Sequence, residues 1–553
     1  MDSAEVCDRD SLRFDEACLR LRNQHGDRDA WIYWLSSDCA ACPYTRVKQL
    51  AANSSSSITI DTLKSSTLRV LDGDDPNEYL STKNISNVIC ELTPNLGQFG
   101  VYELSVRSDG CDVEVLTAPT YVYTELFVIF GVLIVALFGL SSLKLLWHLC
   151  RKKCARHQVD DATSQPVKRR VKAIDTVRGA SILLMIFVND GSGGYKNLGH
   201  ATWNGLLLGD LVFPCFIWIM GVCIPVALAG QIKRMKPRVD IMKGIVKRSV
   251  LLFLIGVSLN TASVGAQLET IRIFGVLQRF GLTYLIVALT YLCLMKKRPA
   301  KSQSPMLREV QDVYVLLPQW CVMLAIVAVH CVLTFCLNVP GCPTGYLGPG
   351  GLHDDGKHYD CVGGAAGYID RVVLKEPHLH HSPSVYNAGP YDPEGILGTL
   401  TSTFHVFLGL HAGIIMMSYK DWKARVIRWL AWAAVFGCIG CTLHFTNLIP
   451  VNKHLWSLSF VFVTTSFSLA LLTVCYLLVD VVNLWNGGPF RIPGMNPLLL
   501  YVGHMLCYQI FPFHWSYGNM ESRGLRLLES IWCVGLWTAI AYIMHKKRTY
   551  ISL

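Results

Sequence analysis

The sequence predicts a polytopic α-helical membrane protein with a β-rich domain at its amino-terminal end. Three observations predict this fold class. Of the 553 residues, 52% are hydrophobic and only 16% are charged, which is unlike a large soluble enzyme. About eleven apolar runs are long enough to cross ~30 Å of hydrocarbon as helices. Six of the 21 cysteines precede the first run, in a segment where short apolar groups alternate with turn residues.

Residues 1–121 form the predicted β-rich domain. Short apolar groups separated by Gly, Asn, Asp and Ser favour a small β-sandwich. Its cysteines and the glycosylation sequons at Asn53 and Asn84 are typical of a domain on the lumenal or extracellular side of a membrane. We expect a structural disulfide between Cys39 and Cys42, although this spacing also occurs in redox motifs.

Lysine and arginine are distributed unevenly between the predicted loops. A first transmembrane helix within 122–149 is followed by a basic linker at 150–172, a ten-helix membrane domain at 173–545 and a tail at 546–553. Loops on the linker side hold 28 Lys and Arg, and loops on the other side hold 8. Because positively charged loops remain cytosolic, we expect the linker and the tail in the cytosol and the β-rich domain in a lumen.

The net charge of +10 is also divided along the chain. The first 121 residues carry 11 basic and 19 acidic side chains, so the positive excess lies entirely in the membrane half. Basic loops beside membrane spans fit anionic lipid better than nucleic acid. We therefore expect membrane lipid, and no nucleic acid, among the partners. A homodimer is compatible with the sequence, which does not decide the oligomeric state.

The segment 338–396 is a long lumenal insertion rich in Gly, His and Tyr. Long loops of this kind are usually functional or disordered. We interpret it as a substrate mouth, as a cap over the helix ends that is cross-linked to the β-rich domain, or as both. The His-Leu-His-His run that ends at His381 lacks a completing set of cysteines or carboxylates, so no bound metal is expected.

Polar residues at membrane depth are concentrated around the second span and the loop that follows it. Ionisable groups are costly there unless they are paired or line water. Asp175 and Arg178 are three residues apart and fit an ion pair, either as an anchor or as part of a ligand site. The glycine-rich run after Asn189 lets the backbone approach a ligand closely, and His200 lies at its lumenal rim.

These segments resemble the heparan-alpha-glucosaminide N-acetyltransferase family. The resemblance rests first on Asp175-Thr-Val-Arg-Gly179 and His200-Ala-Thr-Trp-Asn-Gly205, and it covers most of residues 165–515. Two departures are Asp190-Gly-Ser-Gly-Gly194, where Tyr-Gly-Gly-Gly is usual, and His454, where Asn is usual. The matching stretches are 171–180, 185–189, 200–205, 210–221, 275–279, 363–371, 391–395, 450–459, 494–497 and 501–504.

The resemblance implies acetyl transfer across a lysosomal membrane, from cytosolic acetyl-CoA to the terminal non-reducing glucosamine of heparan sulfate. It also implies that His200 handles the acetyl group. Imidazole can act as a base or as an acyl acceptor, so both an acetyl-histidine route and a direct route remain open. We favour the direct route, in which His200 takes a proton from the attacking amine.

The remaining site residues are assigned from the same motifs. Asn189 is expected to act beside His200 as an oxyanion partner, unless it only caps its helix. Arg279 is a candidate to bind the CoA phosphates, and Lys453 is a candidate to bind anionic groups of the glycan. Alternatively, each side chain only extends from a helix end toward solvent. Glu394 is a candidate second base or a helix-terminal charge. The expected acetyl-CoA-binding residues are Asp175, Arg178, Asp210, Arg279 and Trp203, and the expected acceptor-binding residues are Asn204, Glu394, Lys453 and His504.

Other function classes remain open from the sequence alone. A solute transporter would also carry intramembrane polar residues, but it would be expected to show matching halves, and none is evident. A receptor with a lumenal ligand-binding domain is a further alternative, although the acidic balance of that domain disfavours heparan there. An acyltransferase with a different lumenal acceptor shares the same general plan.

Overall fold

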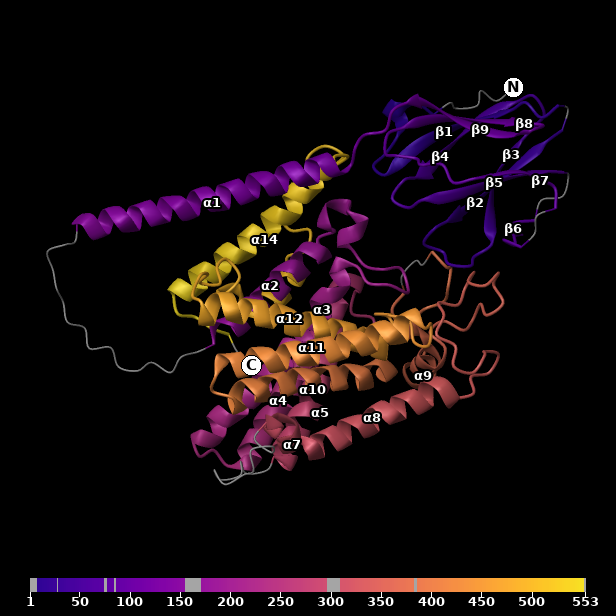
Figure 1. Cartoon of the computed structure of the whole chain (residues 1–553). Coiled ribbons are helices and arrows are strands. Elements are labelled where there is room, and N and C mark those ends of the chain that lie inside the picture. Colours follow the sequence, from indigo (N-terminus) through magenta and orange to yellow (C-terminus); the bar gives the residue numbers. More distant parts are fainter. Residues whose placement is uncertain are drawn as a thin grey trace.

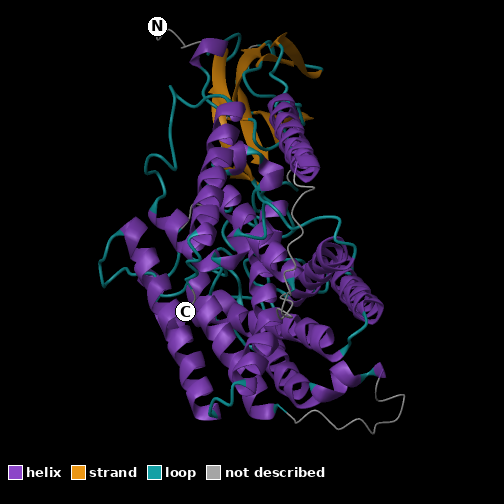
Figure 2. Ribbon diagram, turned by 90° about the vertical axis from the view of Figure 1, so that its left-hand side faces the viewer, coloured by secondary structure: helices purple, strands orange, loops and turns teal. Residues whose placement is uncertain are grey.

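The computed structural model describes residues 7–26, 28–73, 77–83, 86–154, 171–295, 309–381 and 385–551. Figure 1 shows a β-domain that covers one end of a helical bundle, and Figure 2 shows the same arrangement from the side. We call the covered end of the bundle the capped end and the opposite end the far end. The predicted sequon at Asn84 and most of the basic linker lie outside the described residues.

The β-domain consists of two sheets, as the alternating pattern predicts. One sheet has the order β4-β1-β8-β9 and the other β6-β3-β2-β5-β7. All neighbouring strands are antiparallel except β1 and β8. Leu19 and Leu104 of one sheet and Ile32 and Val70 of the other are buried in the same hydrophobic core, which makes the domain a sandwich. The strands are β1 (Glu16–Asn23), β2 (Ala30–Ser36), β3 (Tyr44–Leu50), β4 (Ser55–Asp61), β5 (Ser66–Asp72), β6 (Tyr79–Leu80), β7 (Val88–Leu92), β8 (Val101–Arg107) and β9 (Gly110–Thr117).

Four disulfides lie in the β-domain and in the segment that covers the capped end. Cys90–Cys111 joins β7 to β9 and therefore links the two sheets. Cys39–Cys42 is bonded as predicted. Cys7–Cys18 and Cys342–Cys361 complete the set. The free cysteines whose side chains the structure describes all lie at or after residue 215, in the membrane half.

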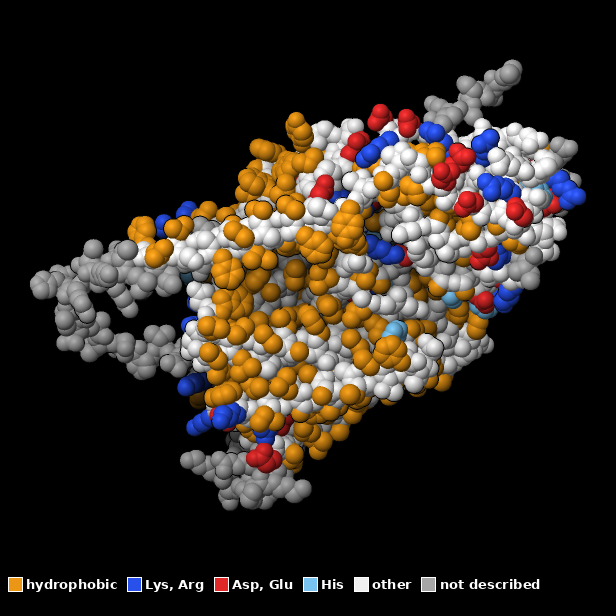
Figure 3. Space-filling view, turned by 45° about the horizontal axis from the view of Figure 1, so that its top comes forward, with side chains coloured by type: hydrophobic (Ala, Val, Ile, Leu, Met, Phe, Trp, Pro, Cys, Tyr) orange, Lys and Arg blue, Asp and Glu red, His pale blue; other side chains and the backbone are white. Residues whose placement is uncertain are grey.

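Most of the described residues after the β-domain are helical. Figure 3 shows hydrophobic side chains across the helical surface, whereas charged side chains gather on the β-domain and toward the far end. The main helices are α1 (Tyr123–Cys154), α2 (Lys172–Asn189), α3 (Leu208–Lys233), α4 (Arg238–Val264), α5 (Val276–Leu294), α7 (Gln311–Val315), α8 (Leu317–Cys336), α9 (Ala365–Leu374), α10 (Ile396–Ser418), α11 (Trp422–Phe445), α12 (Leu458–Tyr476), α13 (Pro497–Leu506) and α14 (Arg523–Lys546).

Seven of the described helices are long and apolar enough to cross a membrane: α3, α5, α8, α10, α11, α12 with its extension to Val481, and α14. The polytopic helical fold is therefore confirmed, whereas the count of eleven spans is not. The other four predicted spans correspond to α1, α2, α4 and α13. The helix α13 ends at Leu506, well before the predicted end at residue 513. Pro512, which has no backbone N–H, lies in the missing part.

Helices α3 and α10 pack closely at the centre of the bundle. A Cβ on Gly221 would lie 2.1 Å from the carbonyl oxygen of Val406, and a Cβ on Gly409 would lie 2.1 Å from that of Trp218. Only glycine permits this approach, which is the way small residues bring membrane helices together. This close packing against α10 fixes the position of α3, whose first turn carries Asp210.

The segment 338–395 covers the capped end and docks on the β-domain without a covalent cross-link. The hydroxyl of Tyr386 donates to the carbonyl of Asp38 over 3.1 Å, and Ser81 donates to Asp355 over 2.8 Å. Cys342 and Cys361 bond to each other, so the expected cross-link to the β-domain is replaced by these polar contacts. The β-domain and this cap together enclose the loop that follows α2.

Candidate active site

A cavity of about 550 Å³ lies at the capped end, where the β-domain, the loop 191–207 and the cap meet. His200 lines it, with 44% of its side chain exposed. Asp38 of the β-domain holds the loop in place by accepting from Lys196 over 2.6 Å and from Thr202 over 3.0 Å. The cavity is lined by Ser37, Asp38, Ala40, Leu63, Lys64, Gly191, Gly194, Tyr195, Lys196, Gly199, His200, Ala201, Thr202, Trp203, Asn204, Gly205, Leu206, Leu207 and Tyr386.

His200 is paired with a buried carboxylate. Its Nδ1 lies 2.9 Å from Oδ1 of Asp210, whose side chain is fully buried. The other oxygen, Oδ2, accepts from the backbone N–H groups of Ala201 and Leu207, each over 3.0 Å. Asp210 occupies the third position of α3, where a helix N-terminus favours negative charge. The carboxylate is therefore fixed before any ligand binds.

Lys453 completes a three-membered group with His200 and Asp210. Its Nζ lies 3.0 Å from Nδ1 of His200 and 3.5 Å from Oδ1 of Asp210. Nδ1 cannot donate to Asp210 and accept from Lys453 at the same time. Donation to the carboxylate leaves Nε2 of His200 with an unshared lone pair, and Nζ of Lys453 lies 3.4 Å from that nitrogen. Burial lowers the pKa of Lys453, although Asp210 and Glu394 act in the opposite direction.

Aromatic rings stack behind His200. Trp203 lies parallel to His454 with ring centroids 5.1 Å apart, and Tyr391 meets Trp203 edge-on at 5.6 Å. Burial, and then the charge of Lys453, lowers the pKa of His454 to about 4. The neighbouring Asn204 accepts from Asn452 over 3.0 Å. These contacts join the loop of His200 to the 450–457 segment that carries Lys453.

A second polar group lies between α5 and the start of α10. Arg272 binds Asp392 over 2.8 Å and Glu394 over 2.7 Å. Burial raises the pKa of Glu394, but Arg272 and Arg279 outweigh it, so this pKa lies below its usual range. Glu394 is therefore an anion held in an ion pair and is poorly suited to act as a free base.

A second pocket, of about 160 Å³, lies deeper in the bundle and is mostly apolar. Arg178 and Arg248 line it together with Gln231, near the far end. Arg178 is paired with Asp175 over 2.7 Å, as the sequence predicts, and also donates to the carbonyl of Gly494. The other lining residues are Phe216, Met220, Cys223, Ile224, Ala227, Leu228, Leu252, Leu277, Phe280, Tyr284, Pro497, Leu498 and Tyr501.

Comparison with known proteins identifies the family. The model of the catalytic region of heparan-alpha-glucosaminide N-acetyltransferase matches residues 170–301. The heparan-alpha-glucosaminide N-acetyltransferase of Mus musculus is 35% identical to the chain, across 98% of it and 89% of the mouse protein. The chain belongs to the heparan-alpha-glucosaminide N-acetyltransferase family. The Homo sapiens protein is also 35% identical, across 98% of the chain and 88% of its own length. Membership in this family of N-acetyltransferases confirms the expectation that the chain is an enzyme.

The site residues predicted from the family motifs fall into separate groups. His200, Trp203, Asn204, Asp210 and Lys453 come together at the capped end. Asp175 and Arg178 lie at the second pocket. Asn189 and His504 contact each other, with Nδ2 and Nε2 3.0 Å apart, and neither lines the large cavity. Arg279 is fully buried beside Trp456 and donates to the carbonyls of Pro393 and Gly395.

Several residues of the site were not predicted. Lys64 and Asp38 line the cavity from the β-domain, and only the docking of that domain on the loop of His200 reveals them. Lys196 belongs to the loop itself, but an exposed lysine carries no distinctive sequence signal. Arg248 lines the second pocket from α4. In the sequence it belongs to a basic stretch beside a cytosolic loop, where arginine is expected from the positive-inside rule alone.

Proposed function

We propose that this family member transfers an acetyl group from acetyl-CoA to the terminal non-reducing glucosamine of heparan sulfate, with His200 as the proton acceptor. The observation that carries the proposal is the buried carboxylate of Asp210 at Nδ1 of His200. This pairing fixes the tautomer with Nε2 unprotonated and stabilises the imidazolium that forms when Nε2 takes a proton. His200 lines a cavity of about 550 Å³, which falls within the usual range for small-ligand sites.

The donor side of the proposal rests on the second pocket. A volume of about 160 Å³ is too small for a whole nucleotide, but its apolar lining suits the narrow pantetheine arm. Arg178 and Arg248 are the cationic groups that would meet phosphates at the far end. Acetyl-CoA would supply an activated thioester there, and the chain would hold and orient it.

Asn189 and His504 lie next to the inner wall of this pocket. Tyr501 lines the pocket and meets the ring of His504 edge-on at 5.3 Å, and His504 in turn contacts Asn189. The Asn189 side-chain amide is therefore linked to that wall through His504 and Tyr501. We assign it to the thioester carbonyl oxygen, where a fixed donor stabilises the developing negative charge.

The reaction in this arrangement is a direct transfer. The unprotonated amine of glucosamine attacks the thioester carbonyl carbon, so that a C–N bond forms and the C–S bond breaks. Nε2 of His200 takes the proton lost by the nitrogen, and that proton leaves with the CoA thiolate. An acetyl-histidine route would place the acetyl group on the same nitrogen, and this intermediate would be trapped when donor is supplied without acceptor.

We further propose that the capped end faces the lysosomal lumen and the far end the cytosol. The four disulfides among the described residues belong to the β-domain and the cap, which supports an oxidising side. The described basic residues near the far end include Arg234, Arg238 and Lys546, which supports a cytosolic side. The donor would then enter from the cytosol and the acceptor from the lumen.

The proposal is tested with full-length protein in detergent, radiolabelled acetyl-CoA and a glucosamine-terminated heparan oligosaccharide. We expect transfer by the unaltered protein and by His381→Ala, whose exposed histidine lies in the cap outside the cavity, and loss of transfer in His200→Ala. Retained transfer in a folded His200→Ala variant would contradict the role of His200. No transfer by the unaltered protein to this acceptor, with transfer to another amine, would contradict the choice of substrate.

A further inference from the structure

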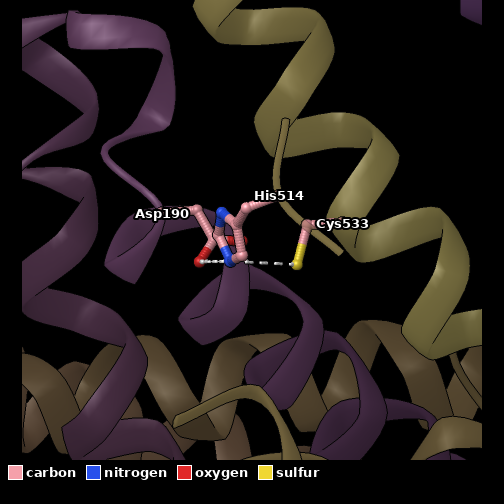
Figure 4. A group of neighbouring side chains, drawn as sticks. All are labelled: Asp190, His514 and Cys533. Atoms are coloured by element: carbon pink, nitrogen blue, oxygen red, sulfur yellow. Dashed lines mark hydrogen bonds and ion pairs between the residues drawn. The ribbon is translucent and has the colours of Figure 1, made fainter. Parts of the chain in front are cut away.

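A buried group of metal-ligating side chains lies at the capped ends of α2 and α14, outside the large cavity. Asp190 follows α2, His514 lies in the segment between α13 and α14, and Cys533 is on α14 (Figure 4). One potential ligand atom of each residue lies within 4.8 Å of the other two. The fold thus brings Asp190 together with two residues that lie more than 300 positions further along the sequence.

We propose that Asp190, His514 and Cys533 form a zinc-binding site. Nε2 of His514 lies 3.6 Å from Oδ1 of Asp190 and 3.8 Å from Sγ of Cys533. In a tetrahedral zinc site, bonds of about 2.0 Å to nitrogen or oxygen and about 2.3 Å to sulfur place such ligand atoms roughly 3.3–3.5 Å apart. These two distances therefore need to close by only a few tenths of an ångström, and the ligand atoms of Asp190 and Cys533 lie within 4.8 Å of each other.

The carboxylate of Asp190 points to a ligand at this position. Its side chain is fully buried, and within the described part of the chain its polar contacts are the imidazole of His514 at 3.6 Å and the thiol of Cys533. Neither contact is a close hydrogen bond to an oxygen or nitrogen donor, and a buried carboxylate with such weak partners is costly. Coordination of a cation by one carboxylate oxygen would compensate this buried negative charge.

The orientation of His514 also fits a metal ligand. Its Nδ1 lies 2.6 Å from Oε1 of Glu529, one turn before Cys533 on α14. A carboxylate on one ring nitrogen fixes the tautomer that presents the other nitrogen as a neutral donor, which is the usual arrangement around zinc-bound histidine. Glu529 is therefore a positioning residue. On binding, the Cys533 thiol would release its proton to solvent and bind as thiolate.

The proposed zinc would fasten the base of the catalytic loop. Asp190 immediately precedes the glycine-rich run that leads to His200, and Arg523 at the start of α14 donates to the carbonyl of Gly194 in that run. Ser530, also on α14, donates to the carbonyl of Asp190 over 3.2 Å. With three protein ligands, the fourth position would be open to water. Because none of the three residues lines either of the two pockets, we nevertheless assign the ion a structural role.

The test measures zinc directly in the full-length protein purified in detergent. We expect about one zinc per chain after dialysis against low free zinc, as for structural sites. Cys533→Ser, His514→Gln and Asp190→Asn should each weaken binding by tenfold or more, and Glu529→Gln by about 10–100-fold. Cys475→Ser, which alters a buried free thiol on α12, should bind like the unaltered protein. Equal zinc in all variants would overturn the proposal.

Two further measurements use the unaltered chain, so that they do not depend on the folding of a variant. Cobalt(II) should give a thiolate-to-metal absorption band, and zinc should protect Cys533, mapped by mass spectrometry, from alkylation while leaving Cys475 unaffected. Absence of the band together with unprotected Cys533 would show that the three residues form only a charged hydrogen-bonded group. Neither measurement depends on acetyl transfer. A negative result would therefore overturn the zinc site and leave the proposed function intact.

Discussion

Nδ1 of His200 lies 2.9 Å from Oδ1 of Asp210, although the turn at 201–207 and the start of α3 separate the two residues. The carboxylate is fully buried and accepts two backbone N–H groups through its other oxygen. Such a carboxylate cannot rotate away from the imidazole without leaving buried donors unsatisfied. The pair is therefore preorganised, and Nε2 is the nitrogen available for chemistry.

Replacement of Asp210 by asparagine is expected to reduce kcat on the order of 10²-fold or more, because an amide NH₂ facing Nδ1 favours the tautomer with Nε2 protonated. The shape of the site would be retained, since the asparagine oxygen can still accept from Ala201 and Leu207. Steady-state kinetics with both substrates checks this, with KM for acetyl-CoA expected to stay within about twofold. An unchanged kcat would exclude Asp210 as a positioning residue.

The sequence predicted the β-sandwich, the Cys39–Cys42 bond and the ion pair of Asp175 with Arg178, because each depends on short-range pattern. It placed Asp210 among acetyl-CoA-binding residues, whereas the structure places it beside His200. That pairing depends on how the loop returns to α3, which periodicity does not encode. The length of α13 was overestimated because residues 507–513 are apolar, although the helix ends at Leu506.

Contacts between distant segments were the hardest to predict. Asp190, His514 and Cys533 carry no metal-ligand spacing along the chain, and no metal was expected because the histidine run that ends at His381 lacks a completing set of cysteines or carboxylates. Lys64 reaches the cavity only because the β-domain docks on the loop of His200. The hydrophobic pattern thus predicts which helices and strands form. It does not predict which polar side chains come into contact when these elements pack.

Arg248→Gln is expected to raise KM for acetyl-CoA by about tenfold, the loss of roughly one charge-assisted hydrogen bond to phosphate. The kcat value and KM for the glucosamine acceptor should stay the same, because Arg248 lines only the second pocket. Arg238→Gln, an exposed arginine at the start of the same helix, is the matched control. Equal KM values in both variants would place the CoA phosphates elsewhere.

The paired replacements Lys64→Ala and Lys196→Ala are expected to raise KM for a sulfated oligosaccharide several-fold more than for an unsulfated one. Both lysines line the cavity and share the single carboxylate of Asp38 at 3.6 and 2.6 Å, which leaves net positive charge for an anionic glycan. Measurement of KM at low and at high salt would show how much of the affinity comes from charge attraction, because salt screens it. Lys48→Ala, on β3 and outside the cavity, should behave like the unaltered protein. If the replacements at Lys64 and Lys196 raised KM equally for both acceptors, the two lysines would have no role in sulfate recognition.

Asp370 in the cap is expected to make the fold more stable in acid. Burial raises its pKa from 3.8 to about 7, so between these values the unfolded chain ionises while the folded chain keeps the proton. The contribution of Asp370 to stability is therefore full below about pH 4 and is lost as pH rises toward 7. In Asp370→Asn, which retains an acceptor for the Ile396 N–H, Tm should fall less between about pH 5 and about pH 7.5 than in the unaltered protein. Asp360→Asn, at an exposed position of the same cap, should leave that difference unchanged, and identical pH profiles for all three proteins would rule out a buried protonated carboxyl at position 370.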